Sequence, residues 1–366
     1  MAKKMRTSEE RTIDPAAQQM LIRADELAVG TAFSRADAMT ACNIGAAGMC
    51  CKICGMGPCR LTKEGDTGGC GATIDTIQAR NLIRAIAAGS AAHSDHGRDM
   101  AFTLKAVANG EAEGYRIRDV AKLRTVARKY GIEIEGRPPE EIADELADLY
   151  IAQYGQQKGE VVLVNRAPAK RLKLWRDLGV VPRGIDREVV EALHRTHIGD
   201  DQDPEHILNH AVRTALADGW GGSMMATDIS DILFGTPAPI LGEANLGVLK
   251  DDMVNVIVHG HEPTLSQMIV AASQDPEIIE YAKQAGAKGV NLAGICCTAN
   301  EILMRQGVPA AGNFLHQELS ILTGSVEAMV VDVQCIMQAL VGLAEKFHTK
   351  VITTSPKVKI KGATHI

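Results

Sequence analysis

Val254-Asn-Val-Ile-Val-His-Gly-His261 is the stretch of sequence that decides the fold. Its first five residues are a short, β-branched and apolar run, which is typical of a buried strand. Similar runs lie at 289–294, 328–332 and 350–354, and helical segments at about 264–285, 298–306 and 336–347 separate the four runs. Strands that alternate with helices at this spacing predict a parallel sheet in an α/β layer fold. No Gly-x-Gly-x-x-Gly motif follows any of the four runs, so the sequence carries no dinucleotide fingerprint.

Toward the N-terminus the patterns become helical. Asp14-Pro15 is a helix start, because Asp is favoured at the N-cap and Pro in the first turn. Apolar residues recur at helical spacing over 74–109, which predicts one long helix or two abutting helices. The one strand-like run before residue 236 is short and lies at 161–164. We therefore predict an α + α/β protein, with a mainly helical domain over residues 1–235 and a Rossmann-like, parallel-sheet α/β domain over residues 236–366.

The composition limits the class of protein. The chain has 366 residues, of which 46% are hydrophobic and 23% charged, and its formal net charge is −6. These values are ordinary for a globular protein, and the acidic balance argues against a nucleic-acid partner. No run of about eighteen apolar residues is present, so we expect no membrane span. No apolar segment with a basic flank opens the chain, so we expect a cytoplasmic location.

Cysteines cluster in one segment of the sequence. The chain has nine, and six of them lie between residues 42 and 70. In a reducing cytosol such thiols are more often metal ligands than disulfides. Four of them, with the spacing C-x2-C-x4-C-x10-C, are Cys51, Cys54, Cys59 and Cys70. A zinc ion or a [4Fe–4S] cluster could accept four thiolates, and the many glycines of this loop favour the cluster because they let backbone amides approach the sulfurs.

Cys42 and Cys50 remain outside this set of four. Two thiolates cannot complete the ligand set of a four-iron cluster, but two chains related by a two-fold axis could provide four. The pair therefore suggests a cluster shared across a homodimer. The alternative is that one or both cysteines pack in the interior, where free cysteines are common.

Soft metal ligands also follow three of the predicted strands. His259 and His261 follow the first, Cys296 and Cys297 follow the second, and Cys335 follows the third. The carboxyl ends of parallel strands meet at one crevice, where open α/β sheets bind ligands. Each residue alone would more often be a core cysteine or a hydrogen-bonded histidine. The three positions together predict a metal site.

The cysteine segment resembles the N-terminal part of the nickel-containing, anaerobic carbon monoxide dehydrogenases. That family carries a C-x7-C pair for a [4Fe–4S] cluster between subunits, which Cys42 and Cys50 match. The four-cysteine motif of a [4Fe–4S] cluster within the subunit follows directly, as it does here. The segments Gly-Ile-Cys-Cys-Thr, Val-Asp-Val-Gln-Cys-Ile and Gly-Ala-Thr-His are also similar to the family. The resemblance covers essentially the whole chain from about residue 20.

The resemblance implies an active Ni–4Fe–4S cluster and assigns ligands to it. His261 is similar to the histidine on the pendant iron, Cys297 to the thiolate bound with it, and Cys335 to a ligand of the cubane. Cys296 is a further candidate, which would move to the cluster during oxidation.

The resemblance also implies a proton route. His93 and His96 lie in a segment similar to the family's H-S-x-H-G-R-H motif, whose histidines lie beside the active cluster and carry protons away from it. The third histidine of that motif is replaced here by Asp99. An aspartate can relay protons as well, although its ordinary pKa is lower than that of histidine.

The implied reaction is the reversible oxidation of CO with water to CO2, two protons and two electrons. The [4Fe–4S] clusters of a homodimer would pass the electrons to a ferredoxin-like acceptor, and an acetyl-CoA synthase or a CO-linked hydrogenase is an expected further partner. Members of the family are longer, and their C-terminal domain provides three more cysteines and a lysine. We therefore expect a fragment that lacks the remaining active-site ligands and is inactive alone, rather than a shortened natural homologue.

Two other interpretations stay open on the sequence. A hybrid-cluster protein, acting as a hydroxylamine reductase, shares related α/β halves. Such proteins usually have the four-cysteine motif near the very N-terminus and lack the C-x7-C pair, so that pair speaks against this interpretation. The other is a non-catalytic, cysteine–metal dimer module held by zinc or by clusters, and broad visible absorption would distinguish clusters from zinc.

Overall fold

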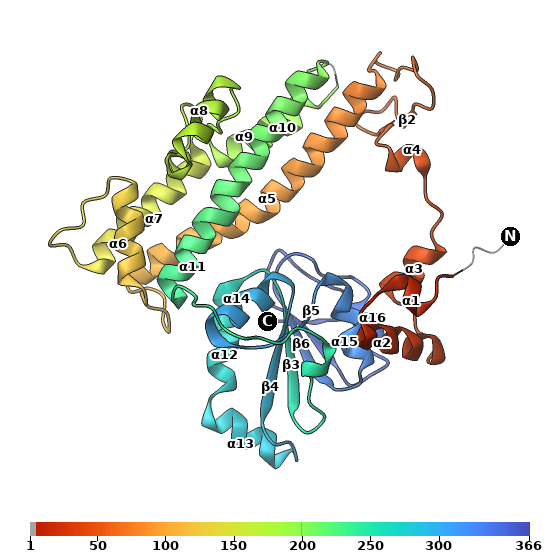
Figure 1. Ribbon diagram of the computed structural model, residues 1–366, viewed down its shortest axis with the longest axis vertical. Helices are drawn as coiled ribbons and strands as arrows, with labels where there is room; N and C mark the ends of the chain where they lie inside the picture. The colour runs from red at the N-terminus through yellow and green to blue at the C-terminus, as the bar shows by residue number, and fades with distance from the viewer. Residues whose placement is uncertain (1–4, 199) are drawn as a thin grey trace. The chain divides into compact units, whose positions relative to one another are not determined.

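The computed structural model describes residues 5–198 and 200–366. The chain forms two compact units (Figure 1). The α/β unit consists of the residues up to Thr40 together with Pro237–Ile366, and the helical unit consists of Ala41–Thr236. Among the helices within the described ranges, none is both long enough and apolar enough to cross a membrane.

The α/β unit is built on a six-stranded sheet in which every neighbouring pair of strands is parallel. The order is β5-β4-β3-β6-β7-β8. The strands are β3 (Val254–Gly260), β4 (Val290–Ile295), β5 (Ala310–Gly312), β6 (Val326–Val331), β7 (Lys350–Thr353) and β8 (Thr364–His365). This is the strand order of a doubly wound Rossmann fold. The predicted fold class, a helical region followed by a parallel α/β sheet, is confirmed.

The order of the strands creates a switch point in the middle of the sheet. β3 comes first along the chain, β4 and β5 are added on one side of it, and β6, β7 and β8 on the other. The connections therefore leave β3 and β6 in opposite directions. In doubly wound sheets, the crevice outside the carboxyl ends of two such strands is where ligands bind.

Helices and 3-10 turns cover this sheet. They are η3 (Leu246–Val248), α12 (Pro263–Ser273), α13 (Pro276–Gln284), α14 (Cys296–Gln306), η4 (Phe314–His316), α15 (Gln317–Leu322) and α16 (Leu340–Ala344). The helical segment predicted at 264–285 is two helices, because Asp275 caps a new helix that starts with Pro276. β5 and β8, which the sequence patterns do not predict, have only three and two residues, too few for a period of two to be visible.

The first helices of the chain belong to the α/β unit. They are α1 (Ser8–Arg11), α2 (Pro15–Glu26) and α3 (Ala32–Ala38). Leu21 and Phe33 pack in the same apolar core as Met329 of β6. The buried carboxylate of Glu318 on α15 accepts hydrogen bonds from the backbone N–H of Ala32 and from the Arg35 guanidinium, both at 2.6 Å. This differs from the expected helical domain over residues 1–235, because an amphipathic helix does not show which surface it will cover.

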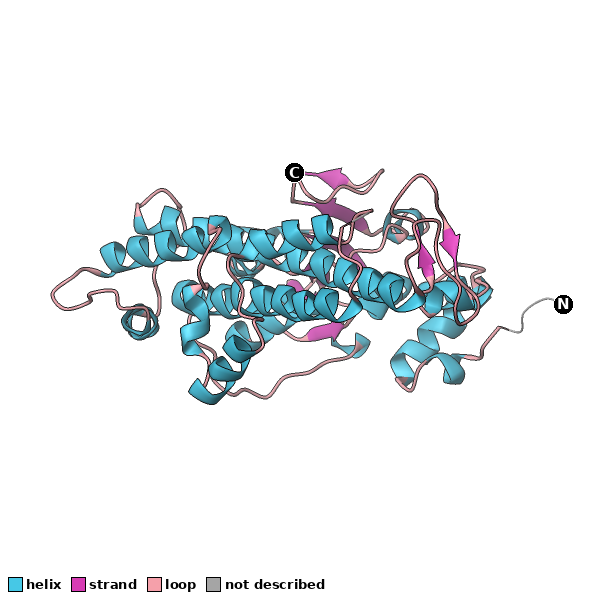
Figure 2. Ribbon diagram, turned by 90° about the horizontal axis from the view of Figure 1, so that it is seen from above, coloured by secondary structure: helices cyan, strands magenta, loops and turns pink. Residues whose placement is uncertain are grey.

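Helices joined by loops make up most of the helical unit (Figure 2). Its elements are α4 (Asn43–Ala46), β1 (Cys50–Cys51), β2 (Cys59–Arg60), α5 (Ile74–Ala108), α6 (Val120–Lys129), α7 (Pro139–Gly155), η1 (Val162–Arg166), α8 (Ala169–Asp177), α9 (Ile185–Arg195), α10 (Pro204–Asp218), η2 (Gly219–Met225) and α11 (Ala226–Phe234). α5 is one continuous helix of 35 residues, in line with the pattern over 74–109. The strand-like run at 161–164 is instead the start of the 3-10 turn η1.

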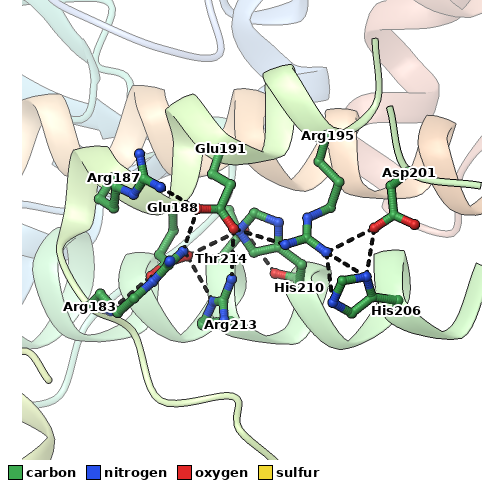
Figure 3. Close-up of polar contacts among 10 residues, drawn as sticks. All are labelled: Arg183, Arg187, Glu188, Glu191, Arg195, Asp201, His206, His210, Arg213 and Thr214. Carbon is green, nitrogen blue, oxygen red and sulfur yellow. Dashed lines mark hydrogen bonds and ion pairs between the residues drawn. The ribbon is translucent and has the colours of Figure 1, made fainter. Parts of the chain in front are cut away.

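A buried ion-pair network joins α9 to α10 (Figure 3). Glu188 of α9 is fully buried. Its carboxylate accepts hydrogen bonds from Arg183 at 3.0 Å, from Arg213 at 2.8 Å and from His210 at 3.0 Å. Glu191, one helical turn further on, accepts from Arg183 at 2.8 Å and from Arg213 at 3.2 Å. The network therefore holds the two helices side by side. Its buried carboxylates are paired with cations, which offsets the cost of burying their charge.

A short π-helix lets α10 and α11 approach α5 closely. A Cβ added to Gly97 of α5 would lie 2.4 Å from the carbonyl oxygen of Gly221 in η2. A Cβ added to Gly222 would lie 2.8 Å from the Cβ of His93 and 2.5 Å from Asp218 Oδ1. Both approaches are open only to glycine. π-helical turns often mark functional sites, and this one lies against His93.

Candidate metal centres

Four cysteines converge on one pocket in the helical unit. Cys51, Cys54, Cys59 and Cys70 all line it. The antiparallel pair of β1 and β2 places Cys51 directly opposite Cys59. A Cβ added to Gly57, in the turn between these strands, would lie 3.1 Å from the carbonyl oxygen of Cys51, so glycine allows the tight turn. The four residues that the sequence predicts as one ligand set thus share one space.

Hydrogen-bond donors lie beside two of the four sulfurs of this pocket, those of Cys59 and Cys70. The N–H of Gly69 points to Cys59 Sγ at 3.4 Å. The backbone N–H of Ala72, together with the Arg80 guanidinium, lowers the pKa of the Cys70 thiol. Donors and positive charge near sulfur favour thiolate, which is the form that binds metals. The donor set fits a metal centre held by four thiolates.

Cys42 and Cys50 lie outside this pocket. Cys42 is exposed at the N-cap of α4, and the N–H of Gly45 donates to its sulfur at 3.4 Å. This hydrogen bond is the main reason why the pKa of Cys42 is lowered, and Arg60 acts in the same direction. Cys50 is half-buried in β1, where it lies opposite Arg60 of β2 in the strand pair. Their use by a cluster shared between two chains stays a prediction.

Three cysteines converge at the carboxyl edge of the sheet in the α/β unit. Cys296 and Cys297 open α14 directly after β4, and Cys335 follows β6. All three line a single cavity of about 540 Å³. Cys296, Gln334 and Cys335 have φ angles of +64°, +67° and +56°, a left-handed conformation that is uncommon outside glycine. Such strained backbone clusters at functional sites.

The raised pKa values of Cys296 and Cys297 also fit a site that binds a cation. Burial, together with the neighbouring Cys335 and Cys297, raises the pKa of Cys296 to about 12. Burial and the neighbouring Cys335 raise the pKa of Cys297 as well. Cys335 raises the pKa of both Cys296 and Cys297, so these two thiols resist becoming thiolates without a positive partner, and a bound metal supplies that charge.

His261 lies next to these cysteines along the sheet edge but does not line their cavity. Its backbone N–H donates to Asp332 Oδ1 at 2.6 Å. Asp332 is the residue directly after β6 and is 1% exposed. Burial raises the pKa of Asp332 to about 7, although backbone N–H groups, with that of His261 first among them, act in the opposite direction.

His259 has a different environment from His261. It is fully buried at the end of β3, and its Nε2 lies 3.1 Å from Gln317 Oε1. The same amide oxygen accepts the N–H of Met337 at 2.9 Å, and the amide nitrogen of Gln317 donates to the carbonyl oxygen of Cys335 at 3.0 Å. Gln317 therefore fixes the Cys335 loop, while His259 is an internal hydrogen-bonding group.

His93 and His96 lie on α5 in the helical unit. His93 Nδ1 lies 3.1 Å from Asp218 Oδ1 at the end of α10. This hydrogen bond raises the pKa of His93, against the effect of burial. His96 is buried, whereas Asp99, at the position of the third histidine, is partly exposed. The roles of these residues in proton transfer stay predictions.

Sequence reasoning did not assign a role to Asp332, Gln317 or Asp218. Asp332 had a weak signal, since it ends a predicted strand three residues before Cys335, whereas Gln317 lies in a short helix of mixed polar and apolar residues and does not stand out. Asp218 had no signal in the sequence, because it is 125 residues from His93. Over residues 5–198 and 200–366, no three His, Cys, Asp or Glu side chains are grouped so as to hold a metal ion directly. The fit of a metal centre rests instead on the two cysteine-lined pockets.

Comparisons with known proteins identify the family. The model of the Prismane/CO dehydrogenase family matches residues 49–366. Carbon monoxide dehydrogenase 1 of Methanosarcina mazei is 55% identical over 368 residues, which cover 100% of this chain and 59% of that protein. The carbon monoxide dehydrogenase/acetyl-CoA synthase subunit beta of Moorella thermoacetica is 46% identical, over 98% of this chain and 54% of its own length.

A solved structure agrees with these matches. The Ni-free carbon monoxide dehydrogenase from Thermococcus sp. AM4 superposes with a TM-score of 0.97 at 50% identity, over 100% of this chain and 59% of that one. The chain belongs to the Prismane/CO dehydrogenase family. Within that family it corresponds to the N-terminal portion of the nickel–iron–sulfur carbon monoxide dehydrogenases. It spans 59% of the length of the first of these curated relatives.

Proposed function

We propose that this chain carries the electron-transfer ligands and part of the active-site ligands of an enzyme that oxidises CO with water to CO2, two protons and two electrons, reversibly. The observation that carries the proposal is the convergence of Cys296, Cys297 and Cys335 at the switch point of the sheet. The relatives described above are carbon monoxide dehydrogenases, and the first of them is 55% identical to this chain. They support this class of reaction.

In this proposal the residues of the α/β unit are ligands of a Ni–4Fe–4S cluster. His261 and Cys297 would hold the pendant iron, Cys335 would hold the cubane, and Cys296 would be an alternative thiolate. When bound, the cluster supplies a metal that makes hydroxide available at neutral pH and accepts the two electrons. The cavity that the three cysteines line, and the raised pKa values of Cys296 and Cys297, support this assignment.

His93 would accept a proton released by the reaction. Its Nδ1 lies 3.1 Å from Asp218 Oδ1, and this hydrogen bond orients the imidazole ring. The carboxylate raises the pKa of His93, which makes the imidazole a stronger base. His96 and Asp99, three and six residues further along α5, would continue the route along the same helix.

Electrons would leave through the cysteines of the helical unit. Cys51, Cys54, Cys59 and Cys70 would hold a [4Fe–4S] cluster within the subunit. The pair of Cys42 and Cys50 would share a second [4Fe–4S] cluster with another copy of the chain. The exposure of Cys42 supports a ligand that meets a second chain. A ferredoxin-like protein would be the acceptor, and an acetyl-CoA synthase or a CO-linked hydrogenase a further partner.

The residues of this chain give an incomplete ligand set for the active cluster. A cubane with nickel and a pendant iron needs more thiolates than those of Cys297 and Cys335. We propose that the remaining ligands lie on sequence beyond these 366 residues, and that CO oxidation requires them.

Anaerobic metal analysis tests this proposal. We expect the 366-residue chain to bind about six irons, four from its own cluster and half of a shared four, with no stoichiometric nickel. In the polypeptide with the complete ligand set, His261→Ala should abolish CO oxidation and leave the irons of the other two clusters in place. His348→Ala is the matched control, since His348 is an exposed histidine of the same unit. Zinc without iron, or CO turnover by His261→Ala, would contradict the proposal.

A further inference from the structure

Asp332 is a buried carboxylate at the switch point of the sheet. It follows β6 directly, next to the end of β3, and its own backbone N–H donates to the carbonyl oxygen of His259 at 3.1 Å. Only 1% of the residue is exposed. A carboxylate in such a place is costly unless hydrogen bonds satisfy its oxygens.

The hydrogen bonds of this carboxylate reach three different segments. Oδ1 accepts the N–H of His261 at 2.6 Å, from the loop after β3, and also the N–H of Val333, from the loop after β6. Oδ2 accepts the hydroxyl of Thr298 at 3.2 Å, from the first turn of α14 after β4. One side chain therefore ties together the loops that follow the three adjacent strands β4, β3 and β6.

The contact between Asp332 and the loop after β3 leaves no room for a side chain at position 260. Gly260 has a φ of +138°, and a Cβ added there would lie 1.7 Å from Asp332 Oδ1. Any other residue at this position would have to displace the carboxylate or the loop. The loop that carries His261 is thus shaped around Asp332.

Each tied segment carries one of the proposed ligands. His261 is itself the residue whose N–H is bound, Cys297 directly precedes Thr298, and Cys335 lies two residues after Val333. We propose that Asp332 is a positioning residue, whose carboxylate fixes the backbone beside all three ligands so that they face one centre. This inference rests on the proposed function for the identity of that centre, but the positioning itself concerns only this chain.

The chemistry of the site favours aspartate over its isosteres. Asparagine would turn one acceptor oxygen into an NH2 group facing backbone N–H or hydroxyl donors, and so would lose at least one of the three bonds. Glutamate would carry the same charge but would need room for one more methylene in a fully packed place.

The test has a structural readout and a metal readout. In the metal-free 366-residue chain, the alkylation rates of Cys297 and Cys335 by iodoacetamide are followed by mass spectrometry. Asp332→Asn should raise both rates several-fold and leave those of Cys51 and Cys70 unchanged. In the polypeptide with the complete ligand set, the same substitution should lower the affinity for nickel by about 10- to 100-fold.

Two further variants make the test specific. Asp228→Asn removes another buried carboxylate, which in the helical unit pairs with Lys122 at 3.1 Å, and should leave the alkylation of Cys297 and Cys335 unchanged. Thr298→Val removes only one bond to Asp332, so it should shift the two rates in the same direction by less. It replaces Asp332→Asn if that variant does not fold.

A folded Asp332→Asn chain with wild-type alkylation rates and wild-type nickel content would overturn the inference. If the wild-type polypeptide with the complete ligand set takes up no nickel, the proposed function fails instead. In that case the alkylation rates of Thr298→Val, which keeps the carboxylate, still decide whether Asp332 positions the cysteines, because Asp332→Asn also removes a charge that raises the pKa of Cys297.

Discussion

Replacing Glu188 by glutamine should destabilise the helical unit more than any comparable change on its surface. Glu188 has no exposed surface, and its carboxylate accepts five hydrogen bonds, three from Arg183, one from His210 and one from Arg213. Glutamine keeps the shape, but it removes the charge and places an NH2 group among donors (Figure 3).

The size of the effect follows from the burial of the partners. Removing one partner of a fully buried ion pair costs about 3–5 kcal/mol. The side chains of Arg183 and Arg213 keep 28% and 17% of their surface exposed, so water can partly compensate them. We therefore expect a loss at the lower end, about 3 kcal/mol. For a unit of this size that loss lowers the Tm by about 6–12 °C.

The pH dependence has a defined sign. Burial alone would raise the pKa of Glu188, but hydrogen bonds from His210 and Arg183 hold it well below its usual 4.5. The stabilisation is therefore present above pH 4.5 and is lost as the pH falls toward the lowered pKa. Burial lowers the pKa of His210 below 6.5, so its protonation in the unfolded chain removes stability as the pH falls from 6.5. Because glutamine has no carboxylate to protonate, the Glu188→Gln penalty should shrink as the pH falls below 4.5.

Thermal unfolding of the metal-free chain, followed by circular dichroism, measures this prediction. Glu141→Gln is the control, because Glu141 is an exposed partner of Arg137 at 3.6 Å and such pairs contribute only about 0–1 kcal/mol. The reasoning would be refuted if the two variants lowered the Tm equally. It would also be refuted if the Glu188→Gln penalty did not shrink at low pH.

Two further predictions concern Asp218, beside the proposed proton acceptor His93, and Gln317, beside the proposed ligand Cys335. Asp218→Asn should lower the pKa of His93, as measured by NMR titration, because the hydrogen bond to the carboxylate is the main cause of its raised value. Stability from that bond is present at low pH and is lost as the pH rises through the raised pKa, so the variant should lose more stability at pH 5.5 than at pH 8.5, and equal losses would contradict it. Gln317→Leu should cost about 3 kcal/mol in guanidinium unfolding, because it leaves several buried polar groups without partners. It should also speed the alkylation of Cys335, and an unchanged rate would show that Gln317 does not hold that loop.

The sequence can predict the parts of the site whose residues lie close together in the chain or follow neighbouring strands. The four cysteines of the motif from Cys51 to Cys70 lie close together in the sequence, and the structure places them in one pocket. The convergence of Cys297 and Cys335 could also be predicted, because it follows from parallel strands alone. Both predictions depend on short-range pattern and on topology, and neither requires knowledge of side-chain packing.

The groups that orient the ligands could not be predicted in this way. The bond between His261 and Asp332 joins residues 71 apart, and that between His93 and Asp218 joins residues 125 apart. No periodicity records such pairs, since any of the 45 acidic residues could in principle be the partner. Likewise, the packing of α2 and α3 on the α/β unit depends on the complementarity of two surfaces rather than on the pattern of either.

The strained backbone at the cysteines explains why such orienting groups are needed. Cys296, Gln334 and Cys335 each adopt a left-handed conformation, which costs of the order of 1 kcal/mol or more for a residue with a side chain. The side chains of Asp332 and Gln317 together make seven hydrogen bonds, each contributing about 0.5–1.5 kcal/mol, and four of them go to residues within two positions of these turns, namely Thr298, Val333, Cys335 and Met337. The two effects are of similar size, so the protein itself can hold the three thiols together before any metal binds.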